Sequence, residues 1–286
     1  MADPRTVAIV TIHGNSRRYG GAYASRYAWP RLQISQLRRY TPKGFSVLAY
    51  GHRLSEEHAD LLRSCPEVAY LTDAAVECPQ GHVWPLRNWI VARACENFRH
   101  IVMLDSDAFP VAYGWLDRYV DALSDERPLA AVQRLENTDT HSDRCFVVFS
   151  RDTWREHELN FTSEGVVDAG ARISEMLERK GLDWHRLNRT NLWNPHPLIA
   201  GVYDGSIYHH SAGTRAPFFR MNQSLRPEGR DTVEFRRERI MHVALTHEIH
   251  ADTDRFIDRL IGRKPPLQRR RLMNNGRALM AEFGLD

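Results

Sequence analysis

Long hydrophobic runs are missing from this sequence of 286 residues. A helix that crosses a bilayer needs about 20 consecutive apolar residues, and no stretch of the chain offers them. The apolar run at residues 7–12 is too short for the hydrophobic part of a signal peptide, and it lacks the basic segment that precedes one. We therefore expect a soluble protein that is not exported and stays in the cytoplasm.

Cysteine is scarce, and its four positions form no metal-binding or redox pattern. Cys65, Cys78, Cys95 and Cys145 show neither the CxxC nor the CxH spacing, which excludes a zinc cage and a thioredoxin-like motif. A chain of this length can build a core without a disulfide framework. We expect reduced cysteines.

An excess of charge of one sign is also absent. The 39 basic residues, most of them arginine, outnumber the 36 acidic residues by only three. That excess is too small for a protein that wraps duplex nucleic acid or makes a polybasic contact with a membrane. We expect no nucleic-acid partner, and a small anion fits the composition better than a polyanion.

Apolar residues are present in the amount and order of an α/β protein. They make up 42% of the chain, enough for a sizeable core. Short β-branched or apolar runs alternate with helical spacing in the first half, which predicts βαβ units and a mainly parallel sheet. The predicted strands cover residues 6–12, 46–50, 68–71 and 100–104, and the predicted helix before the last of them covers 85–98.

The second half of the chain alternates less regularly. Strands are predicted at 129–133 and 145–150 and a helix at 169–180, while the composition of 188–227 favours loops around a pocket. After residue 231 the chain is charged and helical, and Arg269 to Arg271 form a solvent-facing basic segment. We expect one large catalytic domain over 1–230 and a C-terminal helical extension over 231–286.

The most informative segment ends an apolar run with two carboxylates. Residues 100–104 read His-Ile-Val-Met-Leu, and Asp105-Ser106-Asp107 follows directly. A buried parallel strand delivers such side chains to the carboxyl edge of the sheet, where open α/β sheets bind ligands. Two close carboxylates repel each other unless a cation lies between them, and a hard divalent ion that also contacts phosphate resolves the repulsion. The motif indicates a metal and diphosphate site; a simple Asp-x-Asp turn that caps the next helix is the alternative.

The helix before this strand begins with residues suited to an anion. It opens with Pro85-Leu86-Arg87-Asn88, and a helix start beside the sheet edge offers backbone N–H groups and a guanidinium. With the Asp-x-Asp strand, this stretch resembles the nucleotide-sugar glycosyltransferases of the GT-A fold, especially family 2. The resemblance is good over residues 85–110 and diffuse over 7–210. It implies a Rossmann-like, mainly parallel sheet flanked by helices, here with a C-terminal helical tail.

The resemblance also implies the ligands of the site. In that family the two carboxylates hold Mn²⁺ or Mg²⁺ on the diphosphate of the donor, which transfers to Asp105 and Asp107 as metal ligands. Arg87, Asn88 and Asp105 would then contact the nucleotide-diphosphate sugar. The implied partners are this donor and an acceptor with a hydroxyl group.

The loop after the first predicted strand lies where the family binds the nucleoside. Family members usually carry Pro-Thr-x-Asn there, whereas this chain reads Thr-Ile-His-Gly-Asn and ends in Asn15. Asn15 and Arg17 are candidate nucleotide contacts. An exposed basic turn is an equally good reading of Arg17.

Acidic residues precede the predicted helix at 169–180, where the family places its catalytic base. An inverting transfer needs a carboxylate that takes the proton of the acceptor hydroxyl. Asp168 is the first candidate and Glu164 the substitute. Asp168 is also a good N-cap for the helix, which is the structural alternative.

Two adjacent histidines are candidates for a third metal ligand, which many GT-A enzymes supply from a late segment. His209 and His210 follow a short strand pattern at residue 207. Adjacent residues of an extended segment point to opposite faces, so we expect only one of the two to face the ion. A lone histidine is more often structural.

The predicted function is metal-dependent transfer of a sugar from a nucleotide-diphosphate sugar to a hydroxyl, inverting and non-processive. No Gln-x-x-Arg-Trp sequence is present, which argues against a processive synthase. A haloacid dehalogenase-type phosphotransferase also ends a strand in Asp-x-Asp, but there the motif lies near the N-terminus and not at residue 105. A nucleotide- or carbohydrate-binding module without turnover is the non-enzymatic alternative. His247-Glu-Ile-His250 is one residue too short for a metalloprotease motif and is expected at a solvated helix end.

Overall fold

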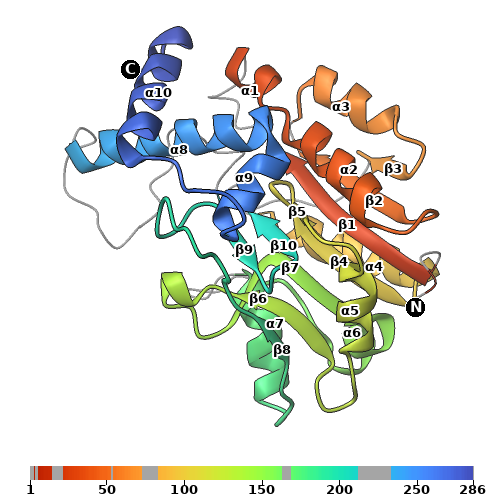
Figure 1. The fold of residues 1–286 in the computed structure, drawn as a ribbon. Helices are drawn as coiled ribbons and strands as arrows, with labels where there is room; N and C mark the ends of the chain where they lie inside the picture. Colours follow the sequence, from red (N-terminus) through yellow and green to blue (C-terminus); the bar gives the residue numbers. More distant parts are fainter. Residues whose placement is uncertain are drawn as a thin grey trace.

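A seven-stranded sheet forms the centre of the molecule (Figure 1). The computed structural model describes residues 3, 6–14, 22–52, 54–72, 83–162, 169–211 and 233–285. The order of the strands across the sheet is β3-β2-β1-β4-β7-β6-β8. Their bounds are β1 (Val7–Gly14), β2 (Ser46–His52), β3 (Val68–Leu71), β4 (His100–Asp105), β6 (Leu129–Gln133), β7 (Ser142–Ser150) and β8 (His185–Leu187).

The sheet is mainly parallel, which confirms the predicted fold class. β1 runs parallel to β2 and β4, β2 runs parallel to β3, and β6 runs parallel to β8. Only β7 is antiparallel to both of its neighbours in the sheet. The carboxyl ends of the parallel strands and the beginning of β7 therefore share one edge.

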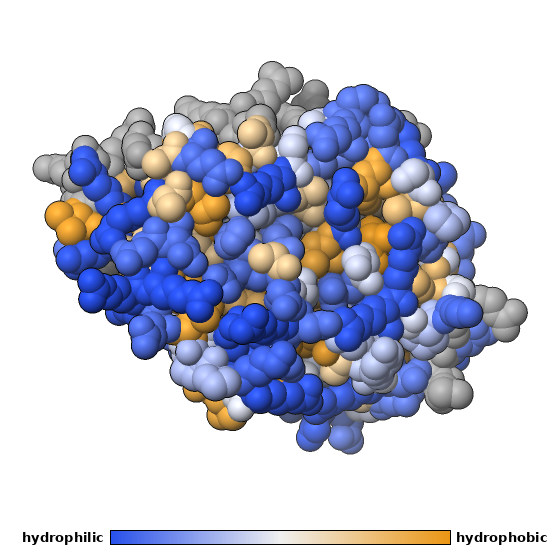
Figure 2. Space-filling model, turned by 45° about the horizontal axis from the view of Figure 1, so that its top comes forward, coloured by the Kyte–Doolittle hydropathy of each residue, from blue (hydrophilic) through white to orange (hydrophobic). Residues whose placement is uncertain are grey.

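Helices cover both faces of this sheet because its central strands are apolar on both sides. In β1, Val7 and Ile9 belong to one hydrophobic core, and Ala8 and Val10 belong to the other. The first core is covered by α2 (Trp29–Tyr40), α3 (Glu56–Arg63) and α5 (Trp115–Asp121). The second is covered by α4 (Trp84–Asn97) and α7 (Ala169–Glu178), with α6 (Arg151–Glu156) following β7. On the face shown in Figure 2, the hydrophobic residues at the surface form separate groups among hydrophilic ones.

A small second sheet begins immediately after the Asp-x-Asp motif. It has the order β5-β10-β9, and all of its pairings are antiparallel. Its strands have three residues each: β5 (Ala108–Pro110), β9 (Gly201–Tyr203) and β10 (Ile207–His209). This sheet connects the central strand β4 with the late segment that carries the paired histidines.

The C-terminal helices rest on this second sheet. They are α8 (Val233–Ala251), α9 (Thr253–Leu260) and α10 (Arg269–Glu282). A third core joins Val202 and Tyr208 of the small sheet with Leu245 of α8 and Phe256 of α9, and α1 (Ala22–Arg26) contributes to a fourth. None of the helices within the described ranges is both long and apolar enough to span a membrane.

One expectation about these helices is wrong. The end of α8 is only partly solvated: Ala251 is exposed, but Ile249 is fully buried, and the His250 ring lies 4.5 Å from the Trp29 ring of α2. The physical reason is that α8 packs against other elements on several sides at once. Its buried residues, 241–246 and 249, form no single apolar stripe from which this burial could be predicted.

Candidate metal centre

The carboxylates of the Asp-x-Asp motif lie at the carboxyl edge of the central sheet. Asp105 is the last residue of β4, Ser106 and Asp107 form a turn, and β5 starts at Ala108. β10 pairs with β5 so that His209 lies opposite Ala108. The second sheet therefore carries His209 to the motif across about 100 residues of chain.

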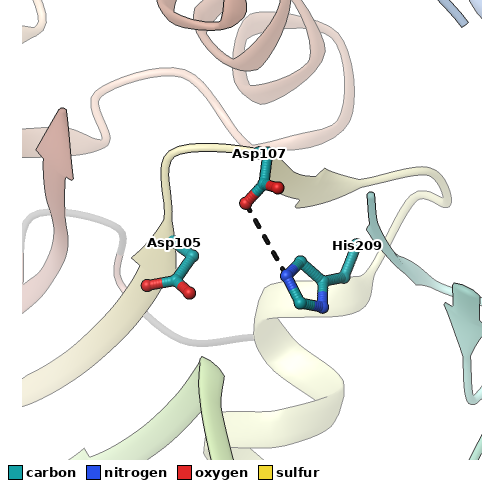
Figure 3. Close-up of side chains that lie close together, drawn as sticks. All are labelled: Asp105, Asp107 and His209. Carbon is teal, nitrogen blue, oxygen red and sulfur yellow. Dashed lines mark ion pairs between the residues drawn. The ribbon is translucent and has the colours of Figure 1, made fainter. Parts of the chain in front are cut away.

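Asp105, Asp107 and His209 form a compact group (Figure 3). One possible ligand atom from each lies within 4.8 Å of the other two. Nε2 of His209 is 3.6 Å from Oδ1 of Asp107, and both side chains are nearly buried, at 5% and 6% exposure. The Asp105 side chain is 20% exposed, so the group faces solvent on the Asp105 side.

The three residues fit a divalent cation. Two carboxylates held this close, one of them buried, repel each other and are costly to desolvate without a positive partner. Carboxylate oxygens suit Mg²⁺ and Mn²⁺, and an imidazole nitrogen adds a ligand that first-row transition metals accept. The donor set can therefore hold one divalent ion at the sheet edge.

Two arginines contact the Asp105 carboxylate of this group. Arg87 lies in the first turn of α4 and donates a hydrogen bond from Nη2 to Oδ1 of Asp105, at 2.8 Å. Nε of Arg144, at the start of β7, is 3.8 Å from Oδ2 of the same carboxylate. The two guanidiniums orient the Asp105 carboxylate and place positive charge beside it.

A second charged cluster lies on the neighbouring strand ends, and the sequence analysis missed it. Nη1 of Arg134, which follows β6, is 3.5 Å from Oδ2 of Asp143 in β7. Burial alone would raise the pKa of Asp143, but the charges of Arg134, His209 and Arg144 together outweigh it, so this pKa lies below its usual range. Asp143 thus carries a fixed negative charge near the metal group.

Glu136 extends that cluster. It lies in the 3-10 helix η4 (Leu135–Asn137), where its carboxylate is 3.6 Å from Nε of Arg134 and accepts a hydrogen bond from the Tyr203 hydroxyl of β9. No sequence signal pointed to these residues, because the antiparallel placement of β7 beside β4 and β6 is a tertiary feature.

Of the two adjacent histidines, the structure brings only His209 to the carboxylates. The His210 ring is fully buried behind the site, with Nδ1 2.7 Å from the Tyr208 hydroxyl and Nε2 3.0 Å from the Thr246 hydroxyl of α8. Burial lowers the pKa of His210 well below its ordinary value. Both ring nitrogens are engaged, so His210 is not in a position to ligate the ion and serves the packing of α8.

Asn88 also has a different partner from the one expected. Its Oδ1 accepts a hydrogen bond from the backbone N–H of Phe161, at 2.7 Å. The side chain thereby ties the segment after α6 to the start of α4, which is a role in the fold. Arg87 is the member of the predicted Arg-Asn pair that faces the site.

Four predicted site residues lie outside the described part of the chain: Asn15, Arg17, Glu164 and Asp168. Their proposed roles in nucleotide binding and proton transfer remain predictions from the sequence.

Comparison with known proteins gives distant structural likenesses only. No family model matches the chain, and no curated protein sequence matches it. The bifunctional glycosyltransferase WbbM is similar over 54% of this chain and 33% of its own, with 13% identity and a TM-score of 0.37. The glycosyltransferase GlyE of Streptococcus pneumoniae TIGR4 is similar over 63% and 44%, with 15% identity and a TM-score of 0.43. The chain thus spans less than half the length of these two proteins.

A third solved structure, from Desulfovibrio desulfuricans G20, is described as a nucleotide-diphospho-sugar transferase. It is similar over 64% of this chain and 80% of its own, with 9% identity and a TM-score of 0.43. Likenesses of this size carry no argument on their own. The mainly parallel sheet and the position of Asp105 and Asp107 at its carboxyl edge agree with the GT-A resemblance of the sequence.

Proposed function

We propose that this protein is a metal-dependent glycosyltransferase that moves a sugar from a nucleotide-diphosphate sugar to an acceptor hydroxyl. The observation that supports this most is the convergence of Asp105, Asp107 and His209 at the carboxyl edge of the sheet. Arg87 beside them supplies charge for an anionic donor. Mn²⁺ or Mg²⁺ is the proposed cofactor.

Each residue of the site has a separate task in this proposal. Asp105, Asp107 and His209 would hold the cation, which when bound neutralises negative charge on the departing diphosphate. Arg87 and Arg144 hold the Asp105 carboxylate in place and add positive charge at its open side. Transfer would join the acceptor oxygen to the anomeric carbon while the bond from that carbon to the diphosphate oxygen breaks.

For the proton of the acceptor hydroxyl we propose Asp168, with Glu164 as the substitute. An inverting reaction needs a carboxylate on the side of the anomeric carbon opposite the diphosphate. Asp168→Asn separates this role from helix capping, because asparagine caps a helix about as well but cannot accept the proton. We expect turnover to fall by roughly two to four powers of ten with donor binding retained. Full turnover would move the assignment to Glu164.

A nucleotide panel tests the proposed donor class. Melting temperatures are measured with UDP, GDP, dTDP and CDP, each with and without Mn²⁺, because a ligand that binds only the folded state raises the melting temperature. We expect at least one nucleotide to stabilise the wild type only when Mn²⁺ is present. Asp107→Ala should remove this effect, whereas Asp152→Ala, at a 60% exposed side chain away from the site, should keep it.

Turnover distinguishes the enzyme from the two alternatives. A transferase releases the nucleotide and joins the sugar to an acceptor, while a binding module shows Mn²⁺-dependent binding without release. A haloacid dehalogenase-type phosphotransferase would instead take a phosphoryl group from a phosphate ester onto the Asp105 carboxylate, releasing the alcohol and forming an acyl phosphate, which mass spectrometry of the intact chain detects. Phosphorylated Asp105 would contradict the proposal.

A further inference from the structure

We propose that Gln33 is the residue that positions the Asp-x-Asp turn for metal binding. Gln33 lies in α2, far from the motif in sequence, and its side chain is fully buried. The inference rests on the proposed metal site, but it assigns a role to a residue that is not itself a ligand.

The amide of Gln33 holds both ends of the turn. Its Nε2 donates one hydrogen bond to the backbone carbonyl of Asp105, at 2.8 Å, and another to that of Ala108, at 2.7 Å. A glutamine amide nitrogen has two hydrogens, so these bonds use its full donor capacity. The carbonyl that ends β4 and the carbonyl that begins β5 are thereby fixed to one point on α2.

Thr11 of β1 fixes the orientation of this amide. Its hydroxyl donates to Oε1 of Gln33 at 3.2 Å, and Thr11 is fully buried. Backbone carbonyls only accept hydrogen bonds, so the opposite orientation of the amide would place an oxygen against two oxygens. The network therefore permits one arrangement, in which β1, α2 and the turn are connected.

The turn is held from its other side by the second sheet. The backbone N–H of His210 donates to the backbone carbonyl of Asp107, at 3.0 Å. The hydrogen bonds from Gln33 and from the His210 N–H together fix the backbone carbonyls of Asp105, Ala108 and Asp107. They thereby set the separation of the two carboxylates. Metal ligands must be held closely to their productive geometry, because a site that is loose by about 1 Å binds poorly.

The surroundings of Gln33 in α2 indicate that its amide serves to hold the turn. Gln33 lies on the buried side of α2 beside Ile34 and Leu37, which belong to the first core. A fully buried amide is costly unless all of its groups are hydrogen-bonded, and here both amide atoms of Gln33 have partners. A leucine would fill the same space and remove the donors that Gln33 provides to two turn carbonyls.

Gln36 offers a matched control on the same helix. It is also a buried glutamine, at 5% exposure, and among the described residues its amide makes no hydrogen bond to the turn. Gln33→Leu and Gln36→Leu therefore make the same chemical change at neighbouring buried positions. Only Gln33→Leu removes the two hydrogen bonds that hold the turn.

The test measures Mn²⁺ affinity by the EPR signal of free Mn²⁺, at a temperature at which circular dichroism shows each variant to be folded. We expect Gln33→Leu to weaken Mn²⁺ binding by about tenfold, the scale of an outer support of a metal site, and Gln36→Leu to leave it within about twofold. Thr11→Val retains Gln33 but removes the hydrogen bond that orients its amide. We expect this variant to weaken Mn²⁺ binding by a smaller factor than Gln33→Leu.

The possible failures are distinguishable. Wild-type protein that binds no Mn²⁺ would refute the metal site and this inference with it. Wild-type binding with equal affinity in Gln33→Leu would refute only the positioning role, as would equal losses in Gln33→Leu and Gln36→Leu. If Gln33→Leu does not fold, Thr11→Val decides, and unchanged Mn²⁺ affinity in that variant overturns the inference.

Discussion

His209 and His210 are neighbours in sequence with opposite tasks. The first lies 3.6 Å from Asp107 in the candidate centre, and the second packs against Thr246 of α8. We expect His209→Ala to weaken Mn²⁺ affinity by about tenfold or more. His210→Ala should keep the affinity and lower the free energy of unfolding by roughly 2–4 kcal/mol, because it leaves a cavity and unpaired hydroxyls. Calorimetric Mn²⁺ titration and urea unfolding check both; a reversed pattern would contradict the assignment.

Arg87 should affect the donor more than the metal. Arg87→Met removes the guanidinium that pairs with Asp105, so the carboxylate remains available to the ion. We expect the affinity for the nucleotide diphosphate in the presence of Mn²⁺ to fall by about tenfold, since one charged hydrogen bond contributes about 1.5 kcal/mol. Mn²⁺ affinity without nucleotide should not fall. Arg93→Met, at an exposed position of the same helix, is the control; equal effects at the two positions would refute the assigned role.

At the residue scale, the sequence predicts the side chains that follow a recognisable pattern. Asp105 and Asp107 could be named because an apolar strand ending in carboxylates has a strong local signal, whereas the two histidines were candidates only through the family resemblance. Arg144 and Gln33 could not be named, because their roles depend on which strand and helix lie beside β4. An isolated arginine or glutamine in a sequence carries no such information.

Close contact between α7 and β7 depends on Gly170. A Cβ atom at this position would lie 2.2 Å from the backbone nitrogen of Arg144, whose side chain faces Asp105. Gly170→Ala therefore forces α7 and β7 apart, at a cost of roughly 1–3 kcal/mol, although alanine favours helix by about 1 kcal/mol. We expect lower stability together with weaker Mn²⁺-dependent nucleotide binding.

Gly276 of α10 provides the matched substitution. A Cβ atom there would lie 2.2 Å from the backbone oxygen of Ile240 in α8, in a helix contact away from the centre. Gly276→Ala should lower the melting temperature in a similar way and leave nucleotide binding unchanged. If both glycine variants lose binding equally, the contact at Gly170 has no special connection with the site.

At the element scale, the predicted strands with β-branched or continuous apolar sequence are confirmed. The predictions at 68–71 and 129–133 coincide with β3 and β6, and the helix at 85–98 corresponds to α4. The strands β5, β9 and β10 were not predicted as a sheet, because three residues provide too little periodicity. Their pairing is nevertheless what places His209 beside Asp107.

Acid sensitivity is expected of the whole molecule. Burial, with the nearby His242, lowers the pKa of His196 to about 4, and burial lowers that of His250 to about 4. Such groups bind protons more readily in the unfolded chain, whose histidines titrate near 6.5. The stability they provide is complete above pH 6.5 and is lost as the pH falls to about 4, by about 1.4 kcal/mol per pH unit for each histidine.

Urea unfolding between pH 7 and pH 4.5 measures this dependence. We expect His250→Gln to reduce the slope of unfolding free energy against pH. Wild-type stability that does not decrease over this range would contradict the burial of these neutral histidines.

The class of the whole fold could be predicted, but the place of its C-terminal part could not. Alternating strands and helices predict the mainly parallel sheet, which the structure confirms. The helices after residue 231 were expected as an extension, and the structure packs Leu245 and Phe256 into one core with the small second sheet. The apolar stripe of α9, with Phe256, Ile257 and Leu260, indicates that this face is buried, but it does not say which distant segment covers it.

The central claim is that Asp105, Asp107 and His209 together hold a divalent cation. The most direct test is an anomalous difference map from crystals of the protein grown with Mn²⁺. We predict one strong anomalous peak bounded by a carboxylate oxygen of each aspartate and a ring nitrogen of His209, and its loss in crystals of Asp107→Ala. A peak at other residues, or none at this edge of the sheet at saturating Mn²⁺, would contradict the claim.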